Sequence, residues 1–334
     1  MKFGLALPHY DFSRPDGAPV SWEGLAEAAR RAESLGFDSV WISDHFFLSL
    51  ARYGGPDEPF GAPEALTALA GLAAVTERVR LGTLVLCAGF RHPAIVAKAV
   101  ATIDLLSGGR LDLGLGAGWY EDEHRAFGYP FGTVGERFEV LEETVEVVSL
   151  LFGEKEPVTW EGRHFSLEAA FCRPRPAQHP RPPLWVGGKG GPRMARLVAR
   201  LADGWNTVWA WTPEDYAERV AVLEEACADQ GRDPATVRRS LGLYALVGRD
   251  ERDLQARWRA LQRWTPGVAL AGVTAEAWGR DKLVGTTDRV VERVSAFADL
   301  GVAELIVSIG SLPFAVFDDE AVEVFARTVI PAVR

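Results

Sequence analysis

The chain has 334 residues, of which 48% are hydrophobic and 25% are charged, as in globular domains. Its formal net charge of −10 argues against nucleic acid as a partner, and no apolar run approaches the about 18 residues of a membrane span. Cys87, Cys172 and Cys227 are scattered and odd in number, which argues against a disulfide framework and favours a reducing cytoplasm.

Short apolar runs alternate with longer amphipathic segments along the chain. The runs begin at Lys2, Ser39, Val79, Arg110, Pro182, Gly204, Leu241 and Glu304. The clearest helix is predicted at 135–152, where apolar residues recur on one face and glutamates lie away from it. Repeated strand–helix units form parallel sheets. Eight units favour a closed (β/α)8 TIM barrel over an open doubly wound sheet.

Two intervals are longer than a single helix requires. Residues 154–181 contain a predicted hairpin that turns at Glu161 and Gly162, followed by a proline-rich segment. Residues 249–284 form the other interval. Neither is long enough for a separate domain, so we expect one barrel domain over 1–334, with insertions after its fourth and seventh strands.

The active site of such a barrel lies at the C-terminal ends of its strands. The first strand ends near His9, a candidate for the substrate pocket. The second, within "SVWISDHFF", ends on Asp44 and His45, an acid beside an imidazole. These two could carry catalysis, or Asp44 could cap a turn beside a rim histidine; the strand alone leaves both readings open.

A glycine-rich turn, "GGKGGPR", follows the fifth strand and precedes a helix. Its backbone N–H groups can approach an anion closely, and the helix N-terminus adds partial positive charge. The turn therefore predicts a phosphate cradle, although a glycine-rich barrel corner explains it equally well. The residues assigned to it are Gly187, Gly188, Gly190, Gly191, Pro192 and Arg193.

Two aromatic segments also follow strands. After the fourth strand, Trp119 could offer a stacking surface, and the acids at 121–123 either serve the site or begin a solvated helix. In "WNTVWAW", Trp211 lies far enough along to line the mouth. Zinc-protease histidine spacing and a G-x-S-x-G elbow are both missing, and no metal ligands are assigned.

Together these strand ends resemble the bacterial luciferase-like monooxygenase superfamily, and within it the coenzyme F420-dependent oxidoreductases. The resemblance is carried by "GFDSVWISDHF", "RVRLGTLVL", "HPAIVAKAVATIDLLSGGRLDLGLGAGWYEDEHRAFG", "GERFEVLEETVEVVSLLF", "PLWVGG…ADGWN" and "VGTTDRVVERVSAFADLGV". These segments run in order through nearly the whole chain. The family fold is a (β/α)8 barrel.

The resemblance implies roles for particular residues. Asp44 and His45 would lie at the deazaflavin ring and the substrate, with His45 carrying a proton. Leu84–Val85 would be a cis peptide that supports the ring from behind. Further cofactor contacts are implied at Gly116, Ala117, Asp122 and the cradle.

The sequence departs from the sugar-phosphate dehydrogenases of that family. An acid follows their Gly-x-Gly where Trp119 stands here, and lysines near the later strands are missing. We therefore expect hydride transfer between F420 and a small apolar or aromatic substrate. The alternatives are an FMN-dependent monooxygenase and a non-catalytic flavin-binding member. A separate reductase would regenerate the reduced cofactor, and a homodimer is compatible with the resemblance.

Overall fold

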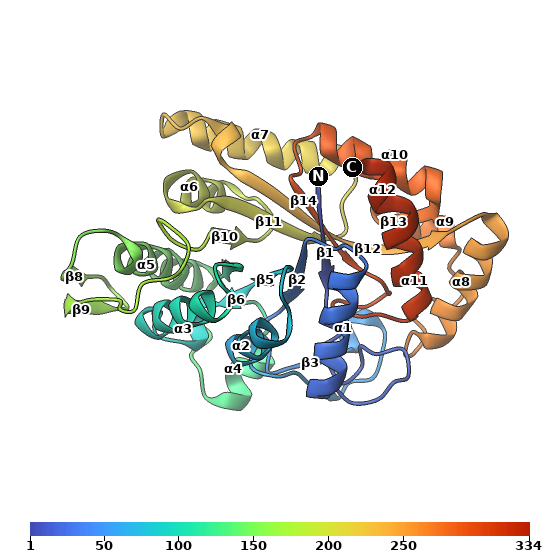
Figure 1. The fold of residues 1–334 in the computed structure, drawn as a ribbon, viewed down its shortest axis with the longest axis horizontal. Helices are drawn as coiled ribbons and strands as arrows, with labels where there is room; N and C mark the ends of the chain where they lie inside the picture. Colours follow the sequence, from blue (N-terminus) through green and yellow to red (C-terminus); the bar gives the residue numbers. More distant parts are fainter.

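Eight parallel strands close into a barrel in the computed structural model, which describes residues 1–334 (Figure 1). The barrel strands are β1 (Lys2–Ala6), β2 (Ser39–Ile42), β5 (Arg80–Thr83), β7 (Leu111–Gly116), β10 (Leu184–Gly187), β11 (Gly204–Trp209), β12 (Arg238–Gly248) and β14 (Glu304–Ser308). Pairing of β7 with β10, and of β14 with β1, completes the circle. The predicted TIM barrel is confirmed.

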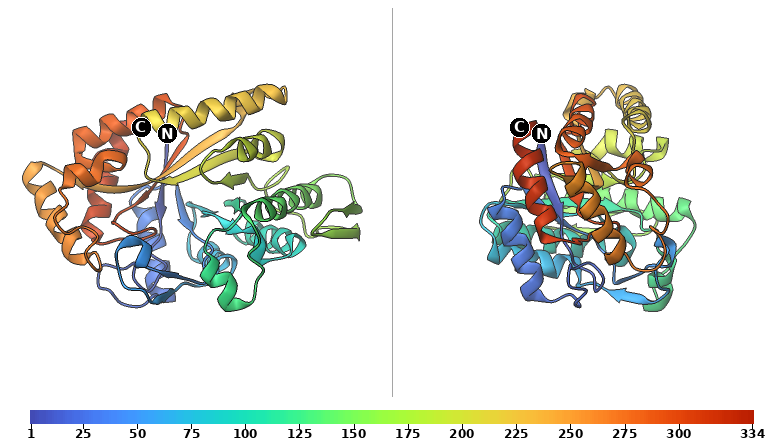
Figure 2. Two further views of the ribbon diagram at one scale, coloured as in Figure 1. Left: turned by 180° about the vertical axis from the view of Figure 1, so that it is seen from behind. Right: turned by 90° about the vertical axis from the view of Figure 1, so that its right-hand side faces the viewer.

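Helices surround this barrel (Figure 2). They are α1 (Trp22–Ser34), α2 (Ala65–Val75), α3 (Pro93–Leu106), α4 (Glu121–Phe127), α5 (Val134–Phe152), α6 (Pro192–Leu201), α7 (Pro213–Asp229), α8 (Glu251–Trp264), α9 (Ala275–Trp278), α10 (Thr287–Asp299), α11 (Asp319–Val324) and α12 (Ile330–Val333). The predicted helix is α5, which begins at a capping box between Thr133 and Glu136. No helix is long and apolar enough to cross a membrane.

Three segments leave the barrel. The predicted hairpin forms between β8 (Val158–Glu161) and β9 (Ser166–Ala170) and projects from the body in Figure 1. In the interval after β12, β13 (Leu283–Thr286) pairs with β12 itself. A third excursion, β3 (Phe47–Ser49), η1 (Ala51–Tyr53) and β4 (Pro59–Gly61), was not predicted. It follows Asp44 and His45 directly and so borders the mouth.

The apolar side chains form two clusters with different positions. The larger one fills the space between barrel and helices and includes Leu141 and Val145 of α5. The smaller one includes Trp41 and Trp185 in the barrel interior and Phe314 after β14. The three cysteines are buried and form no disulfide. The aromatic side chains of this smaller cluster therefore lie in the barrel interior, beneath the C-terminal ends of the strands.

Candidate active site

A backbone bulge follows β5. The Leu84–Val85 peptide is cis, as predicted, and a second non-prolyl cis peptide, Val208–Trp209, was not predicted. A Cβ atom at Gly116 would lie 2.5 Å from Val85 Cγ2, and one at Gly187 would lie 2.7 Å from Val85 Cγ1. Real Cβ atoms do not approach so closely, so both glycines make room for Val85. Packing against Val85 therefore explains why glycine stands at both positions, although both were assigned to cofactor contact.

His45 is hydrogen-bonded to one of the three acids at 121–123, for which the sequence left open a role in the site or a solvated helix start. Its Nδ1 lies 2.6 Å from Oε1 of Glu123, a buried residue of α4. The other carboxylate oxygen, Oε2, accepts from the Phe46 N–H at 2.9 Å. Because a carboxylate accepts, Nδ1 carries the hydrogen and Nε2 is left available to the mouth. Glu123 therefore orients the imidazole.

Asp44 is buried and bound to Arg91 on both carboxylate oxygens. Arg91 donates from Nη1 to Oδ2 at 2.6 Å and from Nη2 to Oδ1 at 2.8 Å. The Cys87 N–H donates to Oδ2 at 2.9 Å, and Arg91 also pairs with Glu64. Burial disfavours the guanidinium charge, but the hydrogen bonds and negative charges of Asp44 and Glu64 together outweigh burial and raise the pKa of Arg91. Asp44 thus joins β2 to the segment after β5, and its contact with a cofactor ring stays a prediction.

His9 begins a chain of buried hydrogen bonds behind the mouth. Burial lowers its pKa to about 3, so the imidazole is neutral. Its Nδ1 donates to the Leu7 carbonyl at 2.9 Å, which leaves Nε2 to accept from Ser43 Oγ at 2.9 Å. Ser43 Oγ in turn accepts from the Tyr10 hydroxyl. His9 is fully buried, and its role in the substrate pocket stays a prediction.

The aromatic walls of the mouth come from several strand ends. Trp119 is 43% exposed, and its ring centroid lies 5.4 Å from that of His45. Trp209 stacks on Tyr244 at 5.3 Å and meets Phe314 edge-on at 5.2 Å. Trp211 lies instead in the larger core against Tyr216 of α7. Trp209 and Trp211 therefore lie in different surroundings, and the role of Trp211 in the substrate pocket stays a prediction.

The glycine cradle between β10 and α6 has one open position. Gly188 and Gly190 have φ of 152° and 70°, backbone that favours glycine, and their Cβ atoms would strike Met194 and Trp205. Gly191, by contrast, has no atom within 4 Å of its ideal Cβ position, and Pro192 begins α6 beside it. The open space and the free N–H groups at this helix N-terminus suit a phosphate.

Two predicted cofactor residues already have protein partners. Arg193 donates to Glu142 of α5 from Nε at 3.0 Å and from Nη2 at 2.7 Å. Asp122, at the exposed start of α4, pairs with Arg125 at 2.5 Å. Ala117 is half-buried just after β7. The roles of these residues toward a cofactor remain predictions.

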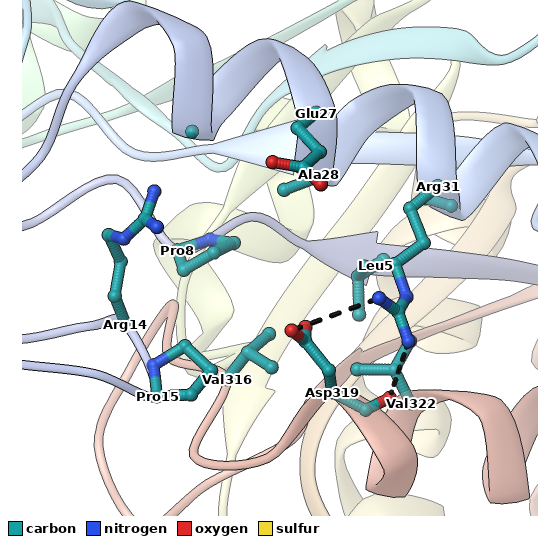
Figure 3. A pocket seen from close by; sticks show the side chains of 12 residues that line it. Leu5, Pro8, Arg14, Pro15, Glu27, Ala28, Arg31, Val316, Asp319 and Val322 are labelled. Atoms are coloured by element: carbon teal, nitrogen blue, oxygen red, sulfur yellow. Dashed lines mark hydrogen bonds and ion pairs between the residues drawn. The ribbon is translucent and has the colours of Figure 1, made fainter.

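A separate pocket lies outside this site. It is lined by residues of α1 and of the segment through α11, including Arg31 and Asp319, which form an ion pair at 3.8 Å (Figure 3). None of the residues predicted for the cofactor or the chemistry lines it. The candidate active site is accordingly the group of strand ends around His45 and Glu123.

Comparison with known proteins assigns the family. The model of the luciferase-like monooxygenases matches residues 1–304. The chain therefore belongs to the luciferase-like monooxygenase family, as the sequence predicted, and is an oxidoreductase of that family.

Two relatives extend the comparison. An F420-dependent glucose-6-phosphate dehydrogenase of Intrasporangium calvum is 32% identical over 93% of this chain and 94% of its own. A phthiodiolone/phenolphthiodiolone dimycocerosates ketoreductase of Mycobacterium tuberculosis is 31% identical over 75% of this chain and 67% of its own.

Solved structures share the fold over the whole chain. The monooxygenase RslO1 from Streptomyces bottropensis has a TM-score of 0.78 and 26% identity, covering 100% of both chains. An F420-dependent secondary alcohol dehydrogenase has a TM-score of 0.78 and 24% identity, covering 100% of this chain and 99% of that one.

Proposed function

We propose that this protein transfers a hydride between coenzyme F420 and a carbonyl or carbinol carbon of a small organic substrate. Support comes from the relatives, because one is named as an F420-dependent dehydrogenase and the other as a ketoreductase. Both names describe chemistry at a carbon that bears oxygen. The observation that carries the proposal is the buried Glu123 carboxylate on Nδ1 of His45, which leaves Nε2 for a proton.

The residues present fit a deazaflavin with a phosphate-bearing tail. The open position at Gly191 and the N-terminus of α6 would hold the phosphate. The bulge at Leu84–Val85, filled by Val85, would back the ring. When bound, F420 supplies a carbon that accepts or gives a hydride. Gly191 and the bulge would then serve to bind and orient the cofactor.

The protein's own contribution to the chemistry is a proton at His45 Nε2. In the oxidative direction, Nε2 takes the proton of the substrate hydroxyl as the C–H hydride leaves. In the reductive direction, Nε2 returns a proton to the carbonyl oxygen. Glu123 holds Nδ1–H in both directions and stabilises the imidazolium that forms. Such a group is worth roughly 10²–10⁴-fold in rate.

An FMN-dependent monooxygenase is the second candidate, supported by the likeness to RslO1 and by the family itself. That reaction would need reduced FMN from a separate reductase. Titration of the purified apo-protein with F420 and with FMN, followed by cofactor absorbance, tests the choice. Tight binding of F420 with weak binding of FMN supports hydride transfer, and the reverse order would favour the monooxygenase.

A further inference from the structure

Arg52 is an exposed arginine at the edge of the mouth with no carboxylate partner. Its guanidinium carbon lies 4.3 Å from the ring centroid of Trp119, and Trp119 in turn contacts His45. Arg52 forms neither an ion pair nor a side-chain hydrogen bond, and the nearby Asp57 accepts from Ser49 Oγ at 2.8 Å instead. A guanidinium that stacks by its face keeps its N–H donors free in its plane.

The turn that carries Arg52 is held in place. Val268, in the loop between α8 and α9, donates its N–H to the Gly54 carbonyl at 3.3 Å. Gly54 and Gly267 both have positive φ, and a Cβ atom at Gly267 would lie 2.1 Å from the Gly54 oxygen. Two excursions, one after β2 and one after β12, therefore lock together beside Arg52. A fixed guanidinium loses less entropy on binding than a free surface arginine.

Two phenols lie near this guanidinium, and the ring centroid of the first, Tyr53, is 5.7 Å from the Arg52 guanidinium carbon. Tyr244 of β12 is 7% exposed and Tyr53 of η1 is half-buried, and neither hydroxyl has a hydrogen-bond partner in the protein. Burial raises the pKa of Tyr244 well above its ordinary value, Tyr53 adds to this, and Arg52 opposes it. Both phenols are therefore neutral donors. Trp209, stacked on Tyr244, gives the same space a flat apolar wall.

We propose that Arg52 binds an anionic oxygen group of the substrate, a carboxylate or a phosphate, so that the enzyme takes aromatic ketones or alcohols carrying that anion beyond the ring. The inference deepens the proposed function and rests on it for the reacting carbon at His45. The aromatic body would lie along Trp119 and Trp209. The anion would lie one indole ring from the imidazole, where Arg52 stands.

The test uses probes of one shape that differ in charge: 4-acetylbenzoate, its neutral amide 4-acetylbenzamide, and 4-acetylphenyl phosphate. Dissociation constants are measured by calorimetry on the full chain, with and without F420. We expect 4-acetylbenzoate or the phosphate to bind about 10- to 100-fold more tightly than the amide, the worth of a charge-assisted hydrogen bond. The preferred anion distinguishes carboxylate from phosphate.

Arg52→Gln should abolish that preference and leave amide binding unchanged. Arg259→Gln, which removes an exposed and unpaired arginine of α8, is the matched control and should keep the preference. Equal affinities for acid and amide in the wild type, or millimolar weakness of all three probes, would overturn the inference. An intact charge preference without F420-dependent turnover would instead count against the proposed function alone.

Discussion

Nδ1 of His45 lies 2.6 Å from Oε1 of Glu123, although the two residues are 78 positions apart in the chain. The pairing exists because β2 and β7 end at the same rim of the barrel. It gives the imidazole a fixed tautomer and a buried counter-charge.

Glu123→Gln should lower turnover by roughly 10²–10⁴-fold, because an amide can donate to Nδ1 and so stabilise the wrong tautomer. Cofactor affinity should stay near normal, since the carboxylate faces His45 rather than the cradle. Glu121→Gln, at the exposed start of the same helix, is the control and should behave as the wild type. A fall in melting temperature that matches the loss of turnover would show a structural role only.

Asp44→Asn should destabilise the fold by about 3–5 kcal/mol. The substitution removes the buried negative charge that faces the guanidinium of Arg91 and leaves Glu64 as its only charged partner. Urea unfolding measures the change. Asp122→Asn breaks an exposed pair and should cost less than about 1 kcal/mol. If Asp44→Asn left the unfolding midpoint unchanged, the pair would not join the two strand ends as described.

Arg193→Ala should weaken cofactor binding by about 1–3 kcal/mol if its guanidinium turns to the phosphate from Glu142. Arg200→Ala is a close control, because Arg200 of α6 pairs with Glu146 of α5 at 2.9 Å in the same way but at the far end of the helix. Equal losses in the two variants would place the phosphate elsewhere.

Glu304 should make stability depend on pH. It is buried at the start of β14, and burial, with Asp112 nearby, raises its pKa from 4.5 to about 7. A raised pKa gives a contribution that is complete below the unfolded value and is lost as pH rises through about 7. The free energy of unfolding should therefore fall by about 3 kcal/mol from this group between pH 4.5 and pH 8.

Glu304→Gln should remove that dependence and be the more stable protein at pH 8. Its carbonyl oxygen can still accept from Ser39 and Trp41. Glu276→Gln on exposed α9 is the control. If the free energy of unfolding changed with pH in the same way in Glu304→Gln and in the wild type, the pH dependence would not come from Glu304.

The barrel was predictable because buried parallel strands appear in sequence as short apolar runs. The excursion from β3 to β4 was not, because strands of three residues carry too little periodicity. The sequence also offered three adjacent acids at 121–123, and only the direction of α4 sets Glu123 inward and leaves Glu121 exposed. Arg91 was missed as the partner of Asp44, since a tertiary ion pair leaves no local pattern.

The glycines illustrate a different limit. Gly116 and Gly187 looked like sites of close ligand approach, but their immediate neighbour is Val85. A glycine in a sequence can indicate that another group lies close to the backbone, but it does not show whether that group belongs to a ligand or to another side chain. The cis peptide at Leu84–Val85 was predicted only from the resemblance to the family.

The central claim is that His45 moves a proton and hardly contributes to holding the cofactor. His45→Ala separates the two when F420-dependent turnover of an aromatic ketone and the dissociation constant of F420 are measured on the same preparation. We expect turnover to fall by roughly 10²–10⁴-fold with little change in F420 affinity or melting temperature. Near-normal turnover by a folded His45→Ala protein would contradict the account.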